Sequence, residues 1–448
     1  MNKDVLIIGA GPAGLAAAVT LLRGGVEPIV LESSSRAGGS IVTHRENGFL
    51  VEGGPNSLML EKDGVEDFFH QLGLVPLEAS SEAKKRFLVC AGRPVAAPAG
   101  LFGAIGTPLL SLRGKLRVLG EPFARRAPEG DETVGAFVRR RLGAEAALRL
   151  VDPLVSGIYA GDIEKLSLRS AFPRLHLMEE KYGSLVLAGL RKRRAAPVRR
   201  MVNFAGGMAE IPNSMVRVLG EDRIRLGAAV QSIEKNAEGW RVTWLNDGEK
   251  HVALARCVLL ACTPQNWEKL PLPASLSALL RPWHLLAAPP LSVISLGYAR
   301  EQVAHPIDGF GMLAPGVERR KILGTLFQSS CFKGRAPDGH VLLTTFLGGS
   351  RNATLTSEDE ASQIKIVRDE LNDLLGVRGS PVFTHITRWN RAIPQYNTGH
   401  ESLLALLASA SKTYPNLFFT GNYCAGVALP KTILHAITTA RDILEKLK

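Results

Sequence analysis

The chain has 448 residues, of which 46% are hydrophobic and 21% are charged; this composition argues against disorder and allows about two or three domains. The five cysteines form no CxxC pair and are odd in number, which argues against a disulfide framework or a zinc site and favours a reducing compartment. The net charge of +12 favours anionic partners, but no nucleic-acid-binding motif accompanies it, so we expect no metal and no nucleic acid.

The first predicted elements are a strand, a glycine turn and a helix. Residues 5–8 are apolar and predict a buried strand, and Gly9, Gly11 and Gly14 follow with GxGxxG spacing. In this pattern Gly9 allows a tight turn, Gly11 lets a pyrophosphate approach the backbone, and Gly14 lets the helix pack against the strand. The helix that begins near Pro12 offers free N–H groups to the phosphates. We therefore predict a dinucleotide-binding unit at residues 1 to about 80.

Glu32 completes this unit, because it ends a second predicted strand at residues 28–31 and can bind the ribose hydroxyls of an adenosine. The glycine pair that follows, Gly38 and Gly39, resembles the second motif of the FAD-binding amine oxidase superfamily. Ser40 stands where that motif usually has an arginine, so one phosphate contact differs. Residues 52–57 form a third glycine element, and residues 418–429 resemble the motif that closes the flavin site in the same superfamily.

The resemblance implies FAD instead of NAD. It implies non-covalent binding, because the related covalent enzymes use a cysteine upstream of the position of Cys424. The residues that the resemblance assigns to FAD are Gly9, Gly11, Pro12, Ala13, Gly14, Glu32, Ser33, Gly39, Ser40, Gly54, Pro55, Asn56, Ser57, Val230, Gly421, Val427, Ala428 and Leu429.

The middle of the chain has a different character. Residues 94–112 are uncharged but contain Pro94, Pro98 and Pro108, so they cannot form one spanning helix. They are either a buried loop with a short helix or an apolar ridge that dips into one leaflet of a membrane. Residues 132–138 begin a helix, with Asp131 or Glu132 near its start. The basic run at residues 191–200 is either a solvated loop or a site of attraction to an anionic membrane or substrate.

The second half of the chain returns to strands. Residues 224–230, 240–244 and 257–261 predict strands of the cofactor unit, and residues 290–350 predict several more. The expected fold is α/β (α+β), a Rossmann-like FAD-binding domain with a mixed-sheet substrate domain and a helical subdomain. We assign 1–85, 200–270 and 385–448 to the FAD-binding domain, 90–195 to a helical, membrane-associating domain, and 271–384 to the substrate domain.

Several local strings resemble the protoporphyrinogen oxidase family across nearly the whole chain. They lie at residues 85–88, 132–134, 140–143, 154–162, 166–173, 309–313, 323–327, 346–349 and 421–423. The family includes enzymes that oxidise protoporphyrinogen IX and enzymes that oxidise coproporphyrinogen III. The resemblance implies protoporphyrinogen IX as the substrate and coproporphyrinogen III as the alternative, with O2 as the electron acceptor and three molecules of H2O2 as the co-product.

The resemblance also assigns residues to the substrate. Arg86 would pair with a propionate, for which its planar fork is suited. Gly157 would place its backbone against the substrate near the flavin, and Asn56 would face both, so these two are the candidate catalytic residues. Without the resemblance, Arg86 would be interpreted as an exposed arginine at the end of a strand, and Leu313, Leu326 and Phe346 would be interpreted as core residues. The candidate substrate-binding residues are Arg86, Phe310, Leu313, Leu326 and Phe346.

Two other functions remain open at this point. One is a flavin oxidase acting on amines or carotenoid precursors, and the other is a non-catalytic flavoprotein that carries porphyrin. We expect no secretory signal, because the apolar residues near Met1 belong to the first strand. The expected location is the cytoplasm, with peripheral contact at the inner face of the cell membrane as an alternative. The sequence leaves open whether the protein is a monomer or a homodimer.

Overall fold

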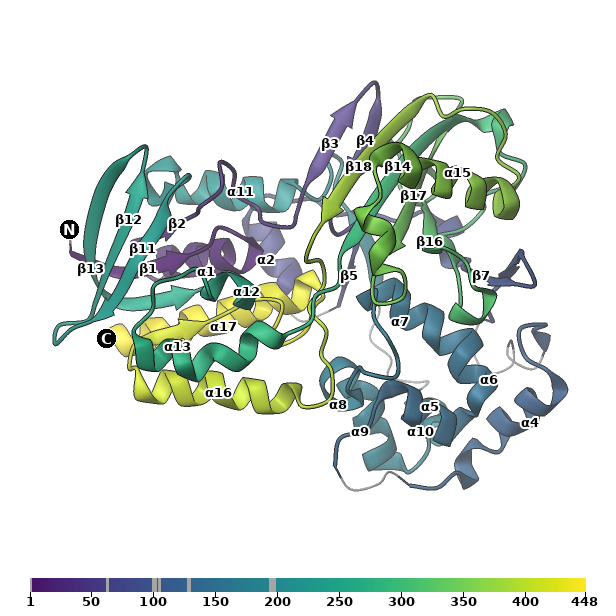
Figure 1. The fold of residues 1–448 in the computed structure, drawn as a ribbon, viewed down its shortest axis with the longest axis horizontal. Helices are drawn as coiled ribbons and strands as arrows, with labels where there is room; N and C mark the ends of the chain where they lie inside the picture. The colour runs from purple at the N-terminus through teal and green to yellow at the C-terminus, as the bar shows by residue number, and fades with distance from the viewer. Residues whose placement is uncertain (1, 62–63, 99–102, 104–105, 127–129, 193–198) are drawn as a thin grey trace.

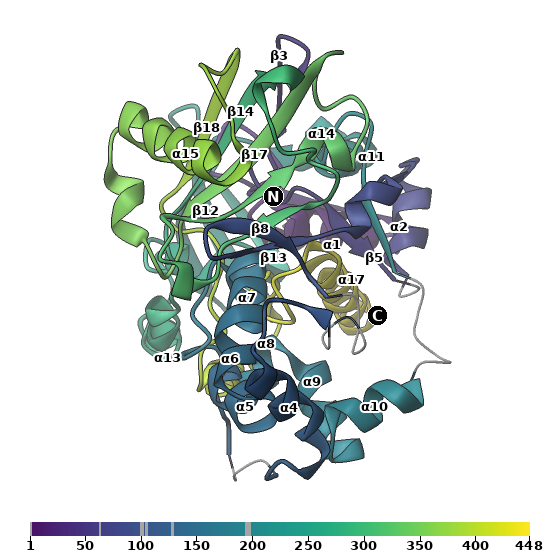
Figure 2. The same ribbon diagram turned by 90° about the vertical axis from the view of Figure 1, so that its right-hand side faces the viewer.

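The structure is a computed structural model that describes residues 2–61, 64–98, 103, 106–126, 130–192 and 199–448. Figure 1 shows two sheet-containing parts side by side and a cluster of helices, α4 to α10, next to the second of them. The same cluster projects below both sheets when the molecule is turned by 90° (Figure 2). The expected α/β fold, with a Rossmann-like unit and a separate mixed sheet, is confirmed.

The first sheet contains the N-terminal strand and is covered by helices. Val5 and Ile7 of its central strand pack into one core, whereas Leu6 and Ile8 pack into another, because this part of the sheet is buried on both faces. The parallel strands are β10 (Ile224–Arg225), β2 (Pro28–Leu31), β1 (Asn2–Ile8), β13 (Glu249–Leu260) and β19 (Leu417–Phe419), and β12 (Trp240–Asn246) and β11 (Ala229–Lys235) extend β13 in antiparallel fashion.

Helices from distant parts of the chain form these two cores. One core holds α1 (Pro12–Arg23), α2 (Val65–Gln71), α11 (Glu210–Leu219) and α17 (Leu429–Leu447), and α17 packs along α1. The other holds α12 (Pro264–Trp267), α13 (Ala274–Leu280) and α16 (His400–Thr413).

The second sheet carries one long helix on one of its faces. Its strands, in spatial order, are β18 (Phe383–Trp389), β14 (Leu291–Ala299), β17 (His340–Gly348), β16 (Ile322–Phe327), β15 (Gly311–Leu313), β7 (Phe87–Cys90) and β8 (Arg93–Ala96). Helix α15 (Glu360–Leu375) buries Val367 and Leu371 against the strand residues of one face, which include Ile294, Met312 and Phe327. The opposite face is therefore available to the rest of the molecule.

The helical cluster is built around Val134, Phe137, Val155 and Tyr159. Thr133 caps the helix expected at residues 132–138, and its hydroxyl accepts a hydrogen bond from Ala136 N at 3.1 Å. The helices are α4 (Leu112–Leu119), α5 (Val134–Leu142), α6 (Ala144–Ala146), the π-helical turn η3 (Ala147–Val151), α7 (Asp152–Tyr159), α8 (Leu168–Ala171), α9 (Pro173–Tyr182) and α10 (Leu185–Lys192).

Short elements connect these parts. The hairpin of β3 (Thr43–Glu46) and β4 (Phe49–Glu52) packs Phe49 on Phe383 of the second sheet. A small sheet joins β5 (Leu58–Leu60), β9 (Arg200–Asn203) and β6 (Leu77–Glu78), and α14 (Gln328–Cys331) follows β16. The 3-10 turns are η1 (Ser81–Lys84), η2 (Glu121–Phe123), η4 (Glu221–Arg223), η5 (Arg281–Leu285), η6 (Arg300–Gln302), η7 (Gly316–Glu318) and η8 (Ala353–Ser357).

The structure differs from the expected boundaries in four places. Strand β8 pairs with β7 in the second sheet, although residues 90–195 were assigned to the helical domain. Helix α13 buries Leu276 and Leu280 in a core of the first sheet, although it was assigned to the substrate domain. Strand β18 pairs with β14 in the second sheet and not with the first. The strand expected at 224–230 is two strands, β10 and β11, separated by a turn at Gly227, where φ is +69°.

Two sequence segments are only partly described. Of the uncharged segment 94–112, residues 99–102 and 104–105 lie outside the described residues, and of the basic run 191–200, residues 193–198 do so. Every helix within the described ranges is too short or too polar to cross a bilayer.

A buried ion pair organises one end of the helical cluster. The side chains of Glu121 and Arg141 are both fully buried, and Arg141 Nε lies 2.7 Å from Glu121 Oε1. The Ser184 hydroxyl and the Leu185 and Val186 N–H groups also donate to this carboxylate. Burial alone would raise the pKa of Glu121, but these donors outweigh it and hold the pKa below its ordinary value.

We expect Glu121→Gln to lower the free energy of unfolding by about 3 kcal/mol, because it removes the nearest counter-ion of the buried Arg141 and leaves only Glu179, which is 3.4 Å away and shared with Arg140. Urea unfolding followed by circular dichroism measures this change. The matched control is Glu164→Gln in the exposed Arg139–Glu164 pair, with an expected loss under about 1 kcal/mol. Because the folded-state pKa is lowered, the Glu121 contribution is complete above pH 4.5 and is lost as the pH falls below it. An equal loss in both variants would contradict the prediction.

Candidate active site

The three glycine elements of the N-terminal region meet at one edge of the first sheet. A Cβ on Gly14 would lie 2.0 Å from the carbonyl oxygen of Gly9, and a Cβ on Gly39 would lie 3.0 Å from the Cα of Gly11. A Cβ on Gly54 would lie 1.9 Å from the carbonyl oxygen of Ser40. The backbones therefore approach so closely that side chains cannot fit between them. Gly11 differs, because a Cβ there would point into open space.

Glu32 lies beside this edge in a fixed orientation. Its Oε2 accepts a hydrogen bond from Ala10 N at 2.8 Å, and its Oε1 accepts one from Ser34 N at 2.9 Å. The sequence predicted only a ribose ligand at Glu32, and the structure adds that the same carboxylate holds the glycine turn in place. Val230 is brought near, because Ala228 N donates to the backbone carbonyl of Glu32 at 2.8 Å.

The C-terminal motif joins the same edge. Thr420 N donates to Leu260 O at 3.0 Å, and Ala261 N donates to Ile8 O at 2.9 Å, so Gly9 and Gly421 follow β1 and β19, the two parallel strands on either side of β13. Helix α17 begins at Leu429. Its N-cap residue is Ala428, whose side chain makes no capping hydrogen bond. Helices α1 and α17, which lie more than 400 residues apart in the sequence, pack against each other at this edge.

These residues fit an FAD molecule. At the N-termini of α1 and α17 no side chain of the N-cap residue accepts a hydrogen bond from the helix, so a ligand oxygen can take that place. The open space at Gly11 matches the approach of a pyrophosphate. When bound, FAD would be held at its adenosine end by the Glu32 region and at its ring end by the first turn of α17.

Asn56 is buried between the two sheets, where both ends of its amide are engaged. Its Oδ1 accepts from Gln328 Nε2 of α14, and its Nδ2 donates to Gly54 O at 2.9 Å. Asn203 Nδ2 donates to the Asn56 carbonyl at 2.8 Å. Asn56 is therefore held rigidly, and one hydrogen of its Nδ2 group remains available for a ligand.

A buried carboxylate supports this loop. Glu52 accepts hydrogen bonds from the Thr43 hydroxyl at 2.6 Å and from Met208 N at 2.9 Å. Burial raises the pKa of Glu52 above its ordinary value, although these donors partly oppose the shift. Glu52 lies within the glycine element at residues 52–57, and no pattern in the sequence indicates this role.

The expected substrate residues share one face of the second sheet. Leu313, Gly324 and Phe346 form one cross-strand row, and Leu326 lies two residues from Gly324 on the same face. This face points away from α15, and Leu313, Leu326 and Phe346 are half-buried on it. Gly157 of α7 lies against it, because a Cβ there would lie 2.8 Å from Leu313 Cδ2. The structure thus brings together the four residues as an apolar surface.

Arg86 and Phe310 lie at the margin of this sheet. Arg86 is exposed and immediately precedes β7, and its guanidinium lies 5.4 Å from the centre of the Phe310 ring. Its neighbour Lys85 pairs with Asp308, and this hydrogen bond lowers the pKa of Asp308. Lys85 is thus already paired, whereas the ring contact leaves the hydrogen-bonding edge of Arg86 free to meet an anion.

Two further residues support the site without any signal in the sequence. Gln328 connects α14 to Asn56, and Tyr396 contacts the C-terminal motif through its hydroxyl. Neither belongs to a recognisable motif, because each acts across a long sequence separation that only folding closes.

Comparisons with known proteins identify the family of the chain. Residues 12–444 match the family described as flavin containing amine oxidoreductase. Protoporphyrinogen oxidase 2, chloroplastic/mitochondrial, of Arabidopsis thaliana is 30% identical over 100% of this chain and 95% of its own. Coproporphyrinogen III oxidase of Bacillus subtilis (strain 168) is 27% identical over 99% of this chain and 98% of its own. A crystal structure from Exiguobacterium sp. 255-15, described as a candidate protoporphyrinogen oxidase, has a TM-score of 0.86 at 25% identity and covers 100% of this chain and 99% of its own.

We expect Gly11→Val to weaken FAD binding by about a hundredfold, or about 2.8 kcal/mol, because its side chain would occupy the open space at the α1 N-terminus. Its backbone angles (φ −71°, ψ 176°) suit any residue, so the melting temperature of the apoprotein should not change. Flavin fluorescence titration and thermal unfolding measure the two quantities. As a contrast, Gly14→Ala should destabilise the apoprotein, because its Cβ would collide with Gly9 O. If Gly11→Val bound FAD with unchanged affinity, the pyrophosphate would not lie at Gly11.

The matched family model spans nearly the whole chain, and the plant relative is 30% identical over 100% of this chain. The glycine elements, the two uncapped helix N-termini and Glu32 lie together as a flavin site requires. The chain is therefore an FAD-binding member of the flavin containing amine oxidoreductase family and, within it, of the protoporphyrinogen oxidase family.

Proposed function

We propose that this protein oxidises protoporphyrinogen IX to protoporphyrin IX, with coproporphyrinogen III as the alternative substrate. The observation that carries the proposal is the half-buried apolar surface of Leu313, Leu326 and Phe346, against which Gly157 lies. A surface of this kind suits a flat tetrapyrrole ring. The names of the plant and Bacillus relatives, which cover both activities, support the same substrate class.

The proposed roles of the chain's own residues are binding and orientation. Leu313, Leu326 and Phe346 contact the macrocycle, and Gly157 lets the ring approach α7 without a side chain in between. Asn56, held by Gln328 and Gly54, orients its remaining N–H toward the reacting region. When bound, FAD supplies the electron acceptor, and six electrons leave the porphyrinogen as three molecules of O2 become three of H2O2.

Arg86 is proposed to bind a propionate at the rim. Its guanidinium is exposed and oriented by the Phe310 ring, so it can form the bidentate contact that carboxylates favour. Protoporphyrinogen has propionates on one side of the ring, whereas coproporphyrinogen has two more in place of vinyl groups. The same arginine can therefore bind a propionate of either substrate. The preference between the two substrates depends on the protein residues that contact the other side of the ring, where one substrate has vinyl groups and the other has propionates.

Anaerobic mixing with each porphyrinogen tests this function. We expect bleaching of the flavin absorbance, with the larger kcat/KM for protoporphyrinogen IX, and Arg86→Ala should raise KM about tenfold with little change in kcat. Arg93→Ala, a matched exposed arginine on neighbouring β8, should leave both constants unchanged.

The possible results separate the alternatives. Failure of both porphyrinogens to bleach the flavin would overturn the proposed function, and peroxide release with amines would favour an amine oxidase. Tight porphyrin binding without peroxide would favour a carrier. An unchanged KM in Arg86→Ala would remove Arg86 from the rim.

We also propose that the helical cluster contacts an anionic membrane surface from the cytoplasmic side. Leu112, Leu116 and Leu119 of α4 and the following Phe123 are 74%, 59%, 47% and 92% exposed. Their spacing puts the three leucines on one side of α4, opposite the buried Gly114. Such an unburied stripe is unusual for a short surface helix.

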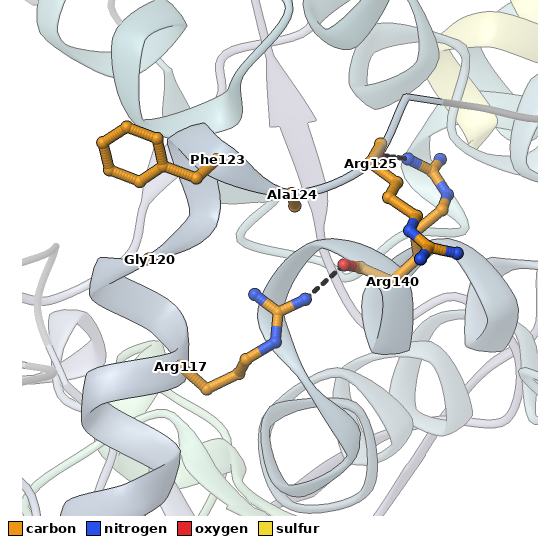
Figure 3. A pocket seen from close by; sticks show the side chains of 6 residues that line it. All are labelled: Arg117, Gly120, Phe123, Ala124, Arg125 and Arg140. Carbon is orange, nitrogen blue, oxygen red and sulfur yellow. Dashed lines mark hydrogen bonds between the residues drawn. The ribbon is translucent and has the colours of Figure 1, made fainter.

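Arginines flank this stripe. Arg117, Arg125 and Arg140 line a pocket of about 350 Å³ next to Phe123, and Figure 3 shows Arg117 directed at the backbone of Arg140. Glu132 pairs with Arg140, and Glu179 pairs with both Arg140 and Arg141. Cations beside an apolar stripe complement the phosphates of an anionic bilayer whose interface accepts the apolar side chains.

We expect the protein to co-sediment with phosphatidylglycerol vesicles but not with phosphatidylcholine vesicles, and to bind more weakly in 0.5 M salt, a concentration at which screening acts within about 4 Å. The double variant Leu116→Ser, Phe123→Ser should bind at least about a hundredfold more weakly, because it removes two inserting side chains. Val382→Ser, which alters an exposed valine near the second sheet, is the control. If the protein were instead a dimer in solution and the double variant were a monomer, the stripe would be a contact with a second copy of the chain and not with a membrane.

A further inference from the structure

Tyr396 contacts both ends of the C-terminal loop that precedes α17. Its hydroxyl donates to Asn422 O at 2.6 Å and accepts from Gly426 N at 2.9 Å. These two backbone groups lie four residues apart, just before the Val427–Leu429 segment assigned to FAD. One side-chain oxygen therefore links the two ends of this loop through hydrogen bonds.

The ring of Tyr396 is fixed from two sides. It is 2% exposed, and His400 at the start of α16 stacks on it with a centroid distance of 4.0 Å and an interplanar angle of 12°. Tyr159 of α7 packs on it at 6.2 Å. Burial raises the pKa of the Tyr396 hydroxyl well above its ordinary value, so the group stays protonated and can donate and accept at the same time.

The backbone around Tyr396 is anchored to the helical cluster. Ser167 N donates to Tyr396 O at 2.8 Å, and Thr398 N donates to Lys165 O at 3.0 Å. The neighbouring Gln395 Nε2 donates to Tyr159 O at 2.8 Å. None of these bonds involves the loop or the cofactor-binding residues, so the anchor does not depend on the contact that it supports.

We propose that Tyr396 is a positioning residue for FAD, which holds the 422–426 loop so that the first turn of α17 is already placed to meet the flavin ring. If the loop is ordered before FAD binds, none of the binding free energy is spent on ordering it. If only a fraction of the protein has the ordered loop, the observed dissociation constant equals the intrinsic one divided by that fraction, so the affinity is weaker. This inference rests on the FAD site alone and is independent of which substrate is oxidised.

Tyr396→Phe tests the proposal, because it removes the hydroxyl and keeps the stacked ring. With deflavinated protein, we expect the FAD dissociation constant to rise about tenfold, consistent with the loss of two ordinary hydrogen bonds. The visible absorption bands of the residual bound flavin should also shift, since the α17 N-terminus is displaced from it. Tyr414→Phe is the matched control, because the Tyr414 hydroxyl contacts Ser275 away from the loop.

Thermal unfolding of each apoprotein separates positioning from folding. Wild-type FAD affinity and a wild-type flavin spectrum in Tyr396→Phe would overturn the proposal, even if its apoprotein melted at a lower temperature. If Tyr396→Phe does not fold, His400→Leu decides, because it removes the stacked ring and leaves the hydroxyl. We expect His400→Leu to bind FAD several-fold more weakly, and unchanged affinity and spectrum there would also overturn the proposal.

Discussion

Backbone segments that approach each other without side chains are the constraint on which the rest of this molecule depends. At the edge of the first sheet, Gly14 lies against Gly9, Gly39 against Gly11, and Gly54 against Ser40. Any larger residue at Gly14 or Gly54 would collide with a carbonyl oxygen, which cannot move aside as a flexible side chain can. These contacts bring three successive loops to the N-terminus of α1, where the N–H groups of the helix favour an anion.

The flavin site is assembled from parts that stabilise each other through buried polar contacts. Asn56 is held by Gln328 of the second sheet region and by Asn203 next to the first. Tyr396 joins the C-terminal loop to the helical cluster. Because buried polar groups are costly to leave unpaired, these contacts favour one relative arrangement of the three structural parts over many others.

The second sheet and the helical cluster contribute surfaces of different chemistry. One sheet face is buried beneath α15, and the other presents Leu313, Leu326 and Phe346 as a half-buried apolar surface that α7 approaches through Gly157. At the far end of the cluster, α4 exposes leucines beside arginines. A flat apolar substrate and an anionic bilayer would thus meet separate faces of the protein, with α7 nearer the first and α4 nearer the second.

Local sequence determined the dinucleotide unit, because the strand, the glycine turn, α1 and Glu32 lie within 32 residues and each has a distinct residue requirement. The resemblance to a family extended this to FAD and to the apolar residues of the second sheet. Only the tertiary structure decided that β8, β18 and α13 belong to other units than expected, since strand pairing and the burial of Leu276 and Leu280 are not encoded by local periodicity. It alone also revealed Gln328, Glu52 and Tyr396, because hydrogen bonds between residues 26 to 272 positions apart form only when the chain has folded.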